Sequence, residues 1–298
     1  MFANMSRGWS MARASLAVLR SYPRMAVLPL ISGAIFVLVL AVILASLMPQ
    51  FGPLHNLTGG IWQKIDPDTS GPVWLFIAGF AVLYVLTAVA VFFNVALIDC
   101  ALRFYAGEVP SVRTGLATAT ARLPQILGWA LVAATVGIVL NGIQSVLKDK
   151  LGFIGDLIGG LLEFSWATVT YFVIPVLVTE RLGPIAALRR SSAILRAKWG
   201  ESLAGEARFG LLGFLFFVQA ALLFALGYAI VSSHGASWMA GLGPLLMVLG
   251  VLYGIGTIVV LHTLNAIFQA GVYSYATSGR VPAALDAALV QGAFRSRA

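Results

Sequence analysis

The sequence predicts an all-α, polytopic membrane protein with six transmembrane helices, and three observations support this fold class. Six apolar runs are each long enough to cross the roughly 30 Å hydrocarbon core of a bilayer, for which a helix needs about 20 residues. Hydrophobic residues make up 60% of the chain and charged residues only 10%, a balance that suits lipid better than water. Nearly all Lys and Arg residues fall in every second connecting segment.

The expected spans are distributed along the whole chain. They cover about residues 25–48, 73–98, 124–147, 157–179, 209–231 and 244–272. The segment before the first span has spread arginines and lacks the short apolar core and cleavage site of a secretory signal, so we expect that span to remain as an anchor. Cys100 lies at the end of the second span, where we expect a small buried hydrophobic side chain and no disulfide.

The distribution of basic residues predicts the orientation of the chain. Of the 19 Lys and Arg residues, 16 lie in the N-terminal segment, the second and fourth connecting segments and the tail. The other side holds only Lys64, Lys148 and Lys150. Because cytoplasmic loops carry the excess of Lys and Arg, we expect both termini in the cytoplasm. The net charge of +8 then faces lipid headgroups and does not indicate a nucleic-acid partner.

The order of the segments suggests three parallel helix-hairpin repeats within a single six-span membrane domain, residues 1–298. Each unit has a basic amphipathic cytoplasmic helix, a span, an outer turn and a returning span. The units cover about residues 1–104, 105–181 and 182–276, and a cytoplasmic tail, 277–298, follows. The ends of the second and sixth spans are alike, because Asn94 precedes Pro110 by 16 residues and Asn265 precedes Pro282 by 17.

The basic segments are expected to form amphipathic helices. Gly183 and Pro184 favour the start of one such helix, in which apolar residues recur at helical spacing beside arginines. A helix of this kind lies in the membrane interface, where each basic residue near anionic lipid contributes about 1 kcal/mol. The residues predicted to contact lipid headgroups are Arg13, Arg20, Arg24, Arg189, Arg190 and Arg196. The alternative is that these helices pack on the ends of the spans.

Polar residues inside spans are the other candidates for function, because lipid makes them costly unless they face protein or water. One side of the sixth span is predicted to contact other helices, with a substrate or proton path as the alternative. Its members are Gly250, Gly254, His262, Asn265 and Gln269. A polar outer vestibule between the third and fourth spans is a further hypothesis. Its members are Asn141, Gln144 and Glu163.

The sequence shows no recognisable catalytic, cofactor-binding or metal-binding set. Residues 152–156 resemble the glycine–aspartate signature of intramembrane aspartyl proteases, but they include one residue too many, and no second intramembrane aspartate accompanies them. His55, His234 and His262 are too scattered to form a metal or haem site. A glycine-rich phosphate loop and a serine elbow are also missing. We therefore predict no cofactor and no enzymatic activity.

Several short motifs are shared with a known family. In chain order they are Phe93-Asn94 with Ala96-Leu97, Trp129-Ala130 with Thr135-Val136-Gly137, Pro175-Val176-Leu177-Val178 with Glu180 and Gly183-Pro184, Arg190-Ser191, Trp199-Gly200-Glu201, and Tyr275-Ala276 with Val281-Pro282. In these residues the chain resembles, almost end to end, a family of uncharacterised prokaryotic six-span membrane proteins. The resemblance implies six spans and a prokaryotic cytoplasmic (inner) membrane, and it supplies no activity.

The sequence favours a non-enzymatic integral membrane protein that organises lipids or partner membrane proteins. The expected partners are membrane lipids, including anionic headgroups, and a second copy of the chain or another membrane protein. The alternative is a small-solute transporter or channel that uses the polar groups on spans 3, 4 and 6, and a membrane enzyme ranks third. These readings differ in what they require, since a transporter needs several polar groups around one wet cavity and a scaffold does not.

Overall fold

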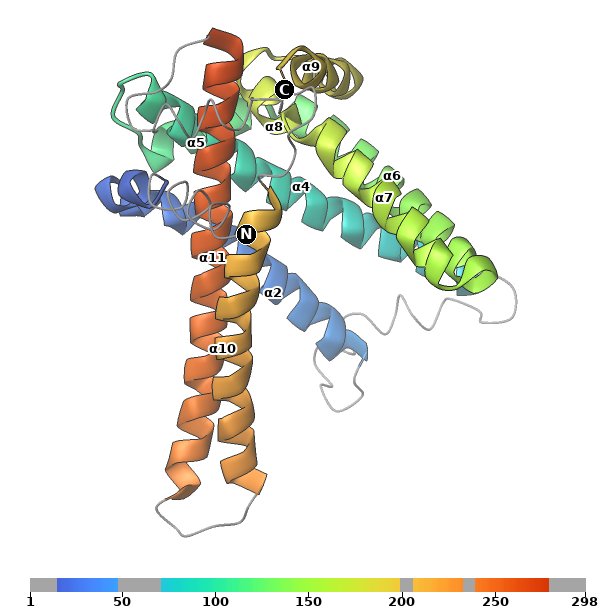
Figure 1. Ribbon diagram of the computed structural model, residues 1–298, viewed down its shortest axis with the longest axis vertical. Coiled ribbons are helices and arrows are strands. Elements are labelled where there is room, and N and C mark those ends of the chain that lie inside the picture. The colour runs from blue at the N-terminus through green and yellow to red at the C-terminus, as the bar shows by residue number, and fades with distance from the viewer. Residues whose placement is uncertain (1–14, 48–70, 199–205, 233–238, 279–298) are drawn as a thin grey trace, which may run out of the picture. The chain divides into compact units, whose positions relative to one another are not determined.

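The computed structural model describes residues 15–47, 71–198, 206–232 and 239–278, and the regular structure within these segments is helical (Figure 1). Six of the described helical segments are long and apolar enough to cross a membrane. They are Pro23–Ile43, Phe76–Tyr105, Leu123–Leu151, Phe153–Thr179, Gly213–Ser232 and Gly241–Ser278. The predicted all-α fold with six transmembrane helices is confirmed.

The outer surfaces of these helices are strongly apolar. Leu38 is 63% exposed and Phe76 is 62% exposed, and many other large hydrophobic side chains along the spans are similarly uncovered. Removing such surface from water is worth about 25 cal/mol per Å², so leaving so much of it in water would be costly, whereas lipid tails accept it. The chain is therefore a membrane protein.

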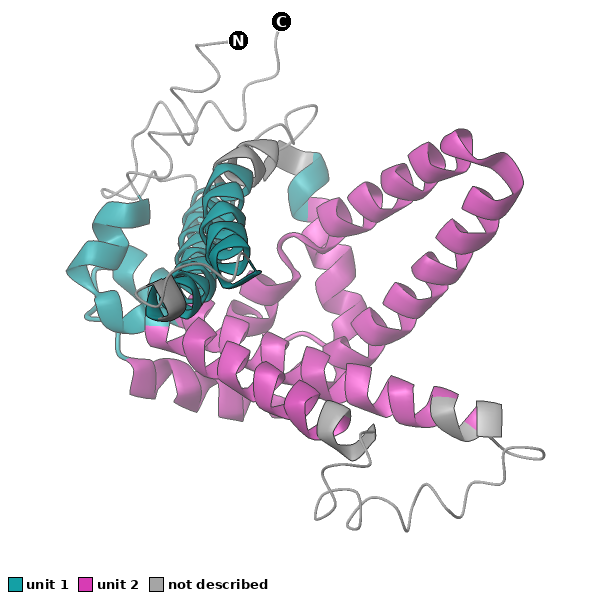
Figure 2. Ribbon diagram, turned by 90° about the horizontal axis from the view of Figure 1, so that it is seen from below, with its two compact units in different colours: residues 1–26, 100–111, 194–298 teal, residues 27–99, 112–193 magenta. Residues whose placement is uncertain are grey.

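The chain folds as two compact units, each of which combines segments that are distant in sequence (Figure 2). Unit 1 contains residues 1–26, 100–111 and 194–298, and unit 2 contains residues 27–99 and 112–193. Two of the four boundaries fall inside helices, namely α4 (Gly71–Tyr105) and α9 (Pro184–Lys198). The three predicted repeats do not follow this division, and they stay a prediction.

Unit 2 contains the greater part of four spans. Its further helices are α2 (Val27–Leu47), α5 (Val112–Ala121), α6 (Leu123–Leu151), α7 (Phe153–Thr170) and α8 (Val173–Thr179). Gly152, with φ of +54°, joins α6 to α7, and this left-handed conformation favours glycine because it has no Cβ. The two helices approach so closely near this turn that a Cβ on Gly155 would overlap the Leu147 carbonyl group. A tight antiparallel hairpin results.

The core of unit 2 lies at the end of this hairpin remote from Gly152. Val95, Leu97 and Ile98 of α4 and Ile126 of α6 have no exposed surface. All residues of α8 from Val173 to Val178 are buried as well. Because α8 is apolar on every side, it sits inside the unit and not on its surface.

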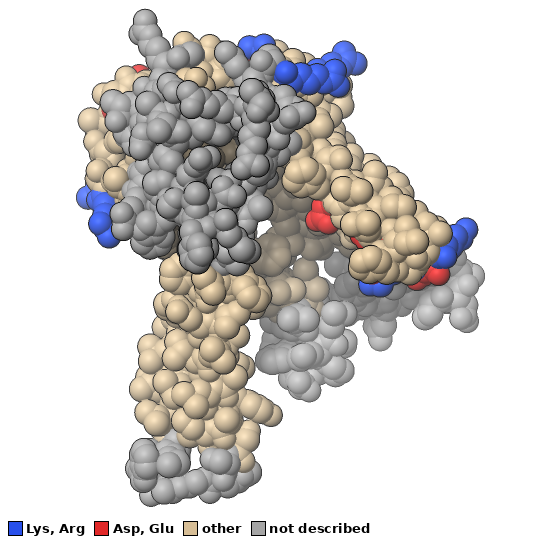
Figure 3. All heavy atoms as spheres, in the orientation of Figure 1, with Lys and Arg blue, Asp and Glu red and all other residues tan. Residues whose placement is uncertain are grey.

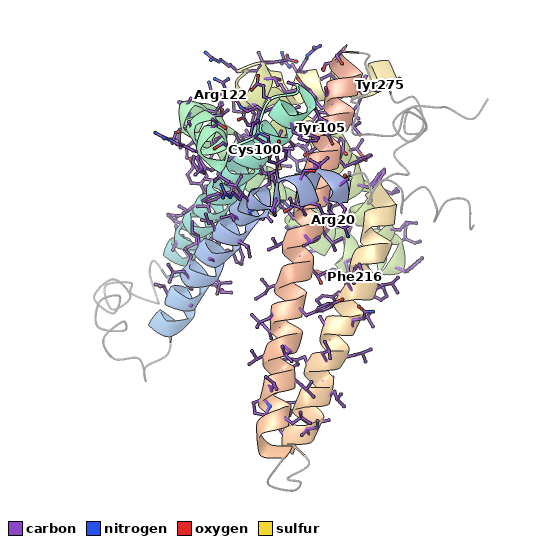
Figure 4. The ribbon with its side chains drawn as sticks, turned by 90° about the vertical axis from the view of Figure 1, so that its left-hand side faces the viewer. Arg20, Cys100, Tyr105, Arg122, Phe216 and Tyr275 are labelled. Atoms are coloured by element: carbon purple, nitrogen blue, oxygen red, sulfur yellow. The ribbon has the colours of Figure 1, made fainter. Side chains whose placement is uncertain are left out.

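Unit 1 is built around a second hairpin, formed by α10 (Glu206–Ser232) and α11 (Met239–Ser278). A short helix over residues 15–21 and the 3₁₀ turn η1 (Pro23–Ala26) belong to the same unit. The last residue of α4, Tyr105, points toward α11, where its hydroxyl group donates a hydrogen bond to the Ile267 carbonyl oxygen at 3.2 Å (Figure 4). This bond fastens the end of α4 to α11. Cys100 is buried in this unit, and its thiol lies 3.3 Å from the Ser111 carbonyl oxygen.

Two features of the spans differ from the sequence prediction. The fourth span was expected as one helix over residues 157–179, but it is divided between α7 and α8 at Tyr171 and Phe172. The second and sixth spans form helices of 35 and 40 residues, longer than a bilayer requires, because a helix need not stop where the lipid ends. The first of these helices ends shortly before Gly107, which has φ of +82°.

Candidate functional site

Helix α9 follows directly after the fourth span and has two different sides. Pro184 stands at its first position, where a missing N–H group costs nothing, and the Ala187 amide closes the first turn onto the Gly183 carbonyl oxygen at 2.8 Å. Ala187 and Ser191 are buried. The exposed residues of the helix include three arginines: Arg189, Arg190 and Arg196. Helix α9 thus presents basic groups outward while its other side packs on protein.

The buried side of α9 is attached to the break in the fourth span. The Ser191 hydroxyl group donates a hydrogen bond to the Val169 carbonyl oxygen at 2.7 Å and accepts one from the Phe172 amide at 3.0 Å. Both backbone groups lie at the break between α7 and α8, where the helical hydrogen-bond pattern is interrupted. An unpaired buried backbone group costs about 1–3 kcal/mol, so one side chain of α9 compensates for the interruption.

Two further contacts hold α9 in place. The Pro184 ring lies so close to Gly128 of α6 that a Cβ there would stand 2.8 Å from the proline Cγ. The Arg190 Nε donates to the Glu180 carboxylate at 2.9 and 3.0 Å. Arg190 was predicted to contact lipid headgroups, and here it pairs with Glu180, whereas Arg189 and Arg196 stand exposed.

Arg122, labelled in Figure 4, joins α5 to α6 and is buried in unit 2, with 9% of its surface exposed. Its Nη2 donates a hydrogen bond to the Val178 carbonyl oxygen near the end of α8 at 3.0 Å. Burial lowers the pKa of Arg122 below its usual value, the positive charge of Arg181 lowers it further, and the negative charge of Asp99 raises it. A guanidinium group stays protonated even so, and a buried cation is thus held at the end of the fourth span.

Two of the three residues of the hypothesised outer vestibule lie together in unit 2, and the vestibule itself stays a prediction. Gln144 Nε2 of α6 donates to the Gly159 carbonyl oxygen of α7 at 3.2 Å and to Glu163 Oε2 at 3.4 Å. Asn141 instead donates to the Gly137 carbonyl oxygen of its own helix at 2.9 Å. The structure therefore brings Gln144 and Glu163 together, and both Asn141 and Glu163 are exposed.

The predicted contact side of the sixth span is divided. A Cβ on Gly250 would stand 2.8 Å from the Phe224 amide nitrogen of α10, and one on Gly254 would stand 3.5 Å from the Ala220 Cβ, so both glycines face α10. His262 and Asn265 are exposed in the single chain, and Gln269 is half-buried. Contact of His262 and Asn265 with another helix stays a prediction.

The remaining predicted headgroup contacts lie in the N-terminal part of the chain. Arg20 and Arg24 are exposed in unit 1, and Arg13 lies outside the described residues. Figure 3 shows further basic side chains over α9 and at the tip of the α6–α7 hairpin. At that tip Lys148 and Asp156 form an exposed ion pair of 3.6 Å. Basic groups therefore mark both ends of this hairpin.

Sequence reasoning missed the two residues that organise the end of the fourth span, Arg122 and Ser191. In the sequence Arg122 is one of the 16 basic residues that indicate the orientation, and its place directly before a span marks it as a boundary residue. Ser191 stands out in the sequence only as part of the Arg190-Ser191 motif. A serine on the buried side of a basic helix was the available signal, since a buried hydroxyl group needs a hydrogen-bond partner.

Among the residues that the structure describes, no three His, Cys, Asp or Glu side chains lie together in a way that could hold a metal ion.

The fold and these groups define the class: a polytopic, all-α membrane protein in which some buried polar groups, such as Arg122 and Ser191, lie at the ends and breaks of spans. The model of a family described as "Family of unknown function (DUF6159)" matches residues 74–283, well over half of the chain. The chain belongs to this family, and the predicted membership of an uncharacterised six-span family is confirmed. No curated protein and no solved structure is detectably similar to it.

Proposed function

We propose that the protein is a non-enzymatic component of the cytoplasmic (inner) membrane that organises anionic lipids or partner membrane proteins. The basic helix α9 would be the part that contacts them. The observation that supports this most directly is the construction of α9. Its inner side is fastened through Ser191 and Pro184, while Arg189 and Arg196 point away from the protein. A helix held this way presents its charges from a fixed backbone, so only the arginine side chains lose conformational freedom on binding.

The orientation follows from the same charges. Arg189 and Arg196 belong to the fourth connecting segment, one of those that hold 16 of the 19 basic residues, which favours a cytoplasmic position for α9 and both termini. The cytoplasmic leaflet carries the anionic lipids and attracts basic residues by about 1 kcal/mol each near its surface. The charge pattern therefore favours the orientation in which the exposed arginines of α9 meet the anionic lipids of the cytoplasmic leaflet.

The test measures lipid preference in proteoliposomes that contain the full chain. Spin-labelled phosphatidylglycerol and phosphatidylcholine report, by electron paramagnetic resonance, the relative association of each lipid with the protein. The double variant Arg189→Gln/Arg196→Gln is expected to lose preference for phosphatidylglycerol, by up to about fivefold for each arginine. The matched control is Lys148→Gln/Lys150→Gln at the opposite end of the hairpin, and equal behaviour of the two variants would exclude the proposal.

A second candidate function is passage of a small solute or ion, and it is favoured by the pair of Gln144 and Glu163. Glu163 lies seven residues beyond Asp156, or about 10 Å along α7, and is thus within a span. A carboxylate at this depth is costly and is typical of an ion pathway. The test measures proton or potassium flux into proteoliposomes that contain the unmodified chain. Flux that is lost in the Glu163→Gln variant would support this candidate. Flux through the unmodified chain equal to that of empty liposomes would exclude it.

A further inference from the structure

A pair of arginines at the ends of the third and fourth spans stands apart from the exposed arginines of α9. Arg122 directly precedes the span Leu123–Leu151, and Arg181 follows the span Phe153–Thr179 by two residues. The Arg122 guanidinium group reaches the Val178 carbonyl oxygen, three residues before Arg181, at 3.0 Å. The two positive charges are close enough to act on one another.

The charges around this pair do not cancel. Asp99, which is 6% exposed, offsets part of the charge on Arg122. The neighbouring carboxylate of Glu180 is bonded to Arg190 at 2.9 Å. Positive charge is therefore in excess among these groups at the end of the spans. Like charges held together in a partly dry environment are stabilised by an anion.

The two arginines differ in how they are held. Arg122 is nine-tenths buried, and its Nε has no hydrogen-bond partner. Arg181 is exposed, and its backbone has φ of +54°, a conformation that L residues other than glycine rarely adopt. Such a conformation at the end of a helix is normally occupied by glycine or asparagine. A charged residue at this position, beside a second arginine, points to a ligand.

We propose that Arg122 and Arg181 together bind one phosphate group, with Arg122 as the fixed partner and Arg181 as the exposed one. Guanidinium groups suit this ligand because their planar N–H groups match phosphate oxygens and remain charged at every physiological pH. The ends of the spans lie at the depth of lipid headgroups, so the phosphate can belong to a lipid. A soluble phosphate that reaches Arg181 from the water would offer the same oxygens.

The experiment titrates the detergent-purified full chain with three probes and follows binding by native mass spectrometry. Inorganic phosphate and short-chain phosphatidic acid test the two sources, and short-chain phosphatidylcholine is the zwitterionic comparison. We expect one equivalent of phosphate or phosphatidic acid to bind saturably. Binding of phosphatidic acid alone assigns the site to a lipid headgroup, and comparable binding of inorganic phosphate assigns it to a soluble ligand.

Variants of Arg181 separate binding from folding. Arg181→Gln should weaken binding of the phosphate probe about tenfold or more, and Arg181→Lys should retain part of it. Arg181→Gly removes the side chain but suits the positive φ, so it should keep the thermal stability of the protein and lose the ligand. Arg122→Gln also removes the buried hydrogen bond to the Val178 carbonyl oxygen, so a loss of binding in this variant would not be separated from a loss of stability.

The matched control is Arg189→Gln/Arg196→Gln, which should bind the phosphate probe as the unmodified chain does. This control separates the two proposals, because it removes the lipid preference assigned to α9 and leaves the arginine pair intact. The phosphate site is overturned if no probe binds saturably, or if Arg181→Gln binds within twofold of the unmodified chain.

Discussion

The hairpins α6–α7 and α10–α11 are both made of apolar helices that approach at glycines, yet they are built differently. In α10–α11 both helices run without a break, and Gly227, Gly243 and Gly250 each lie against the backbone of the opposite helix. In α6–α7 the returning span is divided, and Trp129 and Trp166 stack with ring centroids 6.1 Å apart. We call the hairpin α10–α11, in which both helices are continuous, the rod, and we call the break between α7 and α8 the joint of the other hairpin.

The difference shows where a membrane protein places its polar groups. The polar bond between α10 and α11 links the Tyr253 hydroxyl group to Gln219 at 2.7 Å and leaves both helices regular. Unit 2 has the Ser191 bridge, the Gln144–Glu163 pair and buried polar atoms of Asn94, Arg122, Gln125 and Thr168 that lack a hydrogen-bond partner. Among the described residues unit 1 has one such atom, Ser15 Oγ, so the unpartnered polar atoms are concentrated in unit 2, which makes unit 2 the better candidate for a ligand site.

The largest expected effect comes from forcing the rod apart. Gly250→Leu places a side chain against the Phe224 amide and the Ala220 carbonyl group, at 2.8 and 3.0 Å from the new Cβ. Backbone cannot move aside as a flexible side chain can, so we expect a loss of about 3 kcal/mol in the free energy of unfolding. Titration with sodium dodecyl sulfate in mixed micelles measures it.

Gly256→Leu on the same helix is the matched control, because nothing lies within 4 Å of a Cβ at that position. It should unfold at nearly the same detergent fraction as the unmodified chain. If the two variants lose equal stability, the close approach of α10 and α11 does not hold unit 1 together.

A smaller effect is expected at the joint of the other hairpin. Ser191→Ala leaves the Val169 carbonyl group and the Phe172 amide without the bridging hydroxyl group, at a cost of about 2 kcal/mol. Hydrogen exchange at Phe172 should increase, because its amide then opens more readily to water. Ser192→Ala is the control, since that hydroxyl group only bonds the Arg189 carbonyl oxygen of its own helix. Similar exchange rates in both variants would contradict the role given to Ser191.

The smallest effect is expected from the polar bond within the rod. Tyr253→Phe removes the hydroxyl group that donates to Gln219, and bonds between membrane helices contribute about 0.6 kcal/mol on average. The same titration should show a change of this size. A loss as large as that of Ser191→Ala would mean that both hairpins depend equally on polar contacts, and the comparison between them would fail.

The spans could be predicted from the sequence because their signal is local. A run of apolar residues of sufficient length requires a helix in lipid, where every backbone group must bond within the segment. The expected span 124–147 and the observed Leu123–Leu151 differ only at their ends, where charged residues such as Lys148 continue the helix into the headgroups.

The break in the fourth span has a local signal, but its partner and the site residues do not. Pro175 cannot donate to the Tyr171 carbonyl group four residues earlier, which interrupts the helix at this point, whereas the bridge from Ser191 comes from a residue 19 positions after Phe172. The approach of Gln144 to Glu163 depends on the register of the hairpin, and Gly152 and Gly155 set that register through a tertiary contact. Periodicity shows which residues share a helix face, but not which faces meet.

The bridge at Ser191 also has a consequence for the order in which the protein is made. A ribosome makes the chain from the N-terminus, so Val169 and Phe172 are synthesised before Ser191, which follows 22 and 19 residues later. Until then the Val169 carbonyl group and the Phe172 amide lack the hydrogen bonds that the Ser191 hydroxyl group makes with them. The fourth span therefore reaches its final form only when α9 has left the ribosome, so the shape of one span is completed by the helix that follows it.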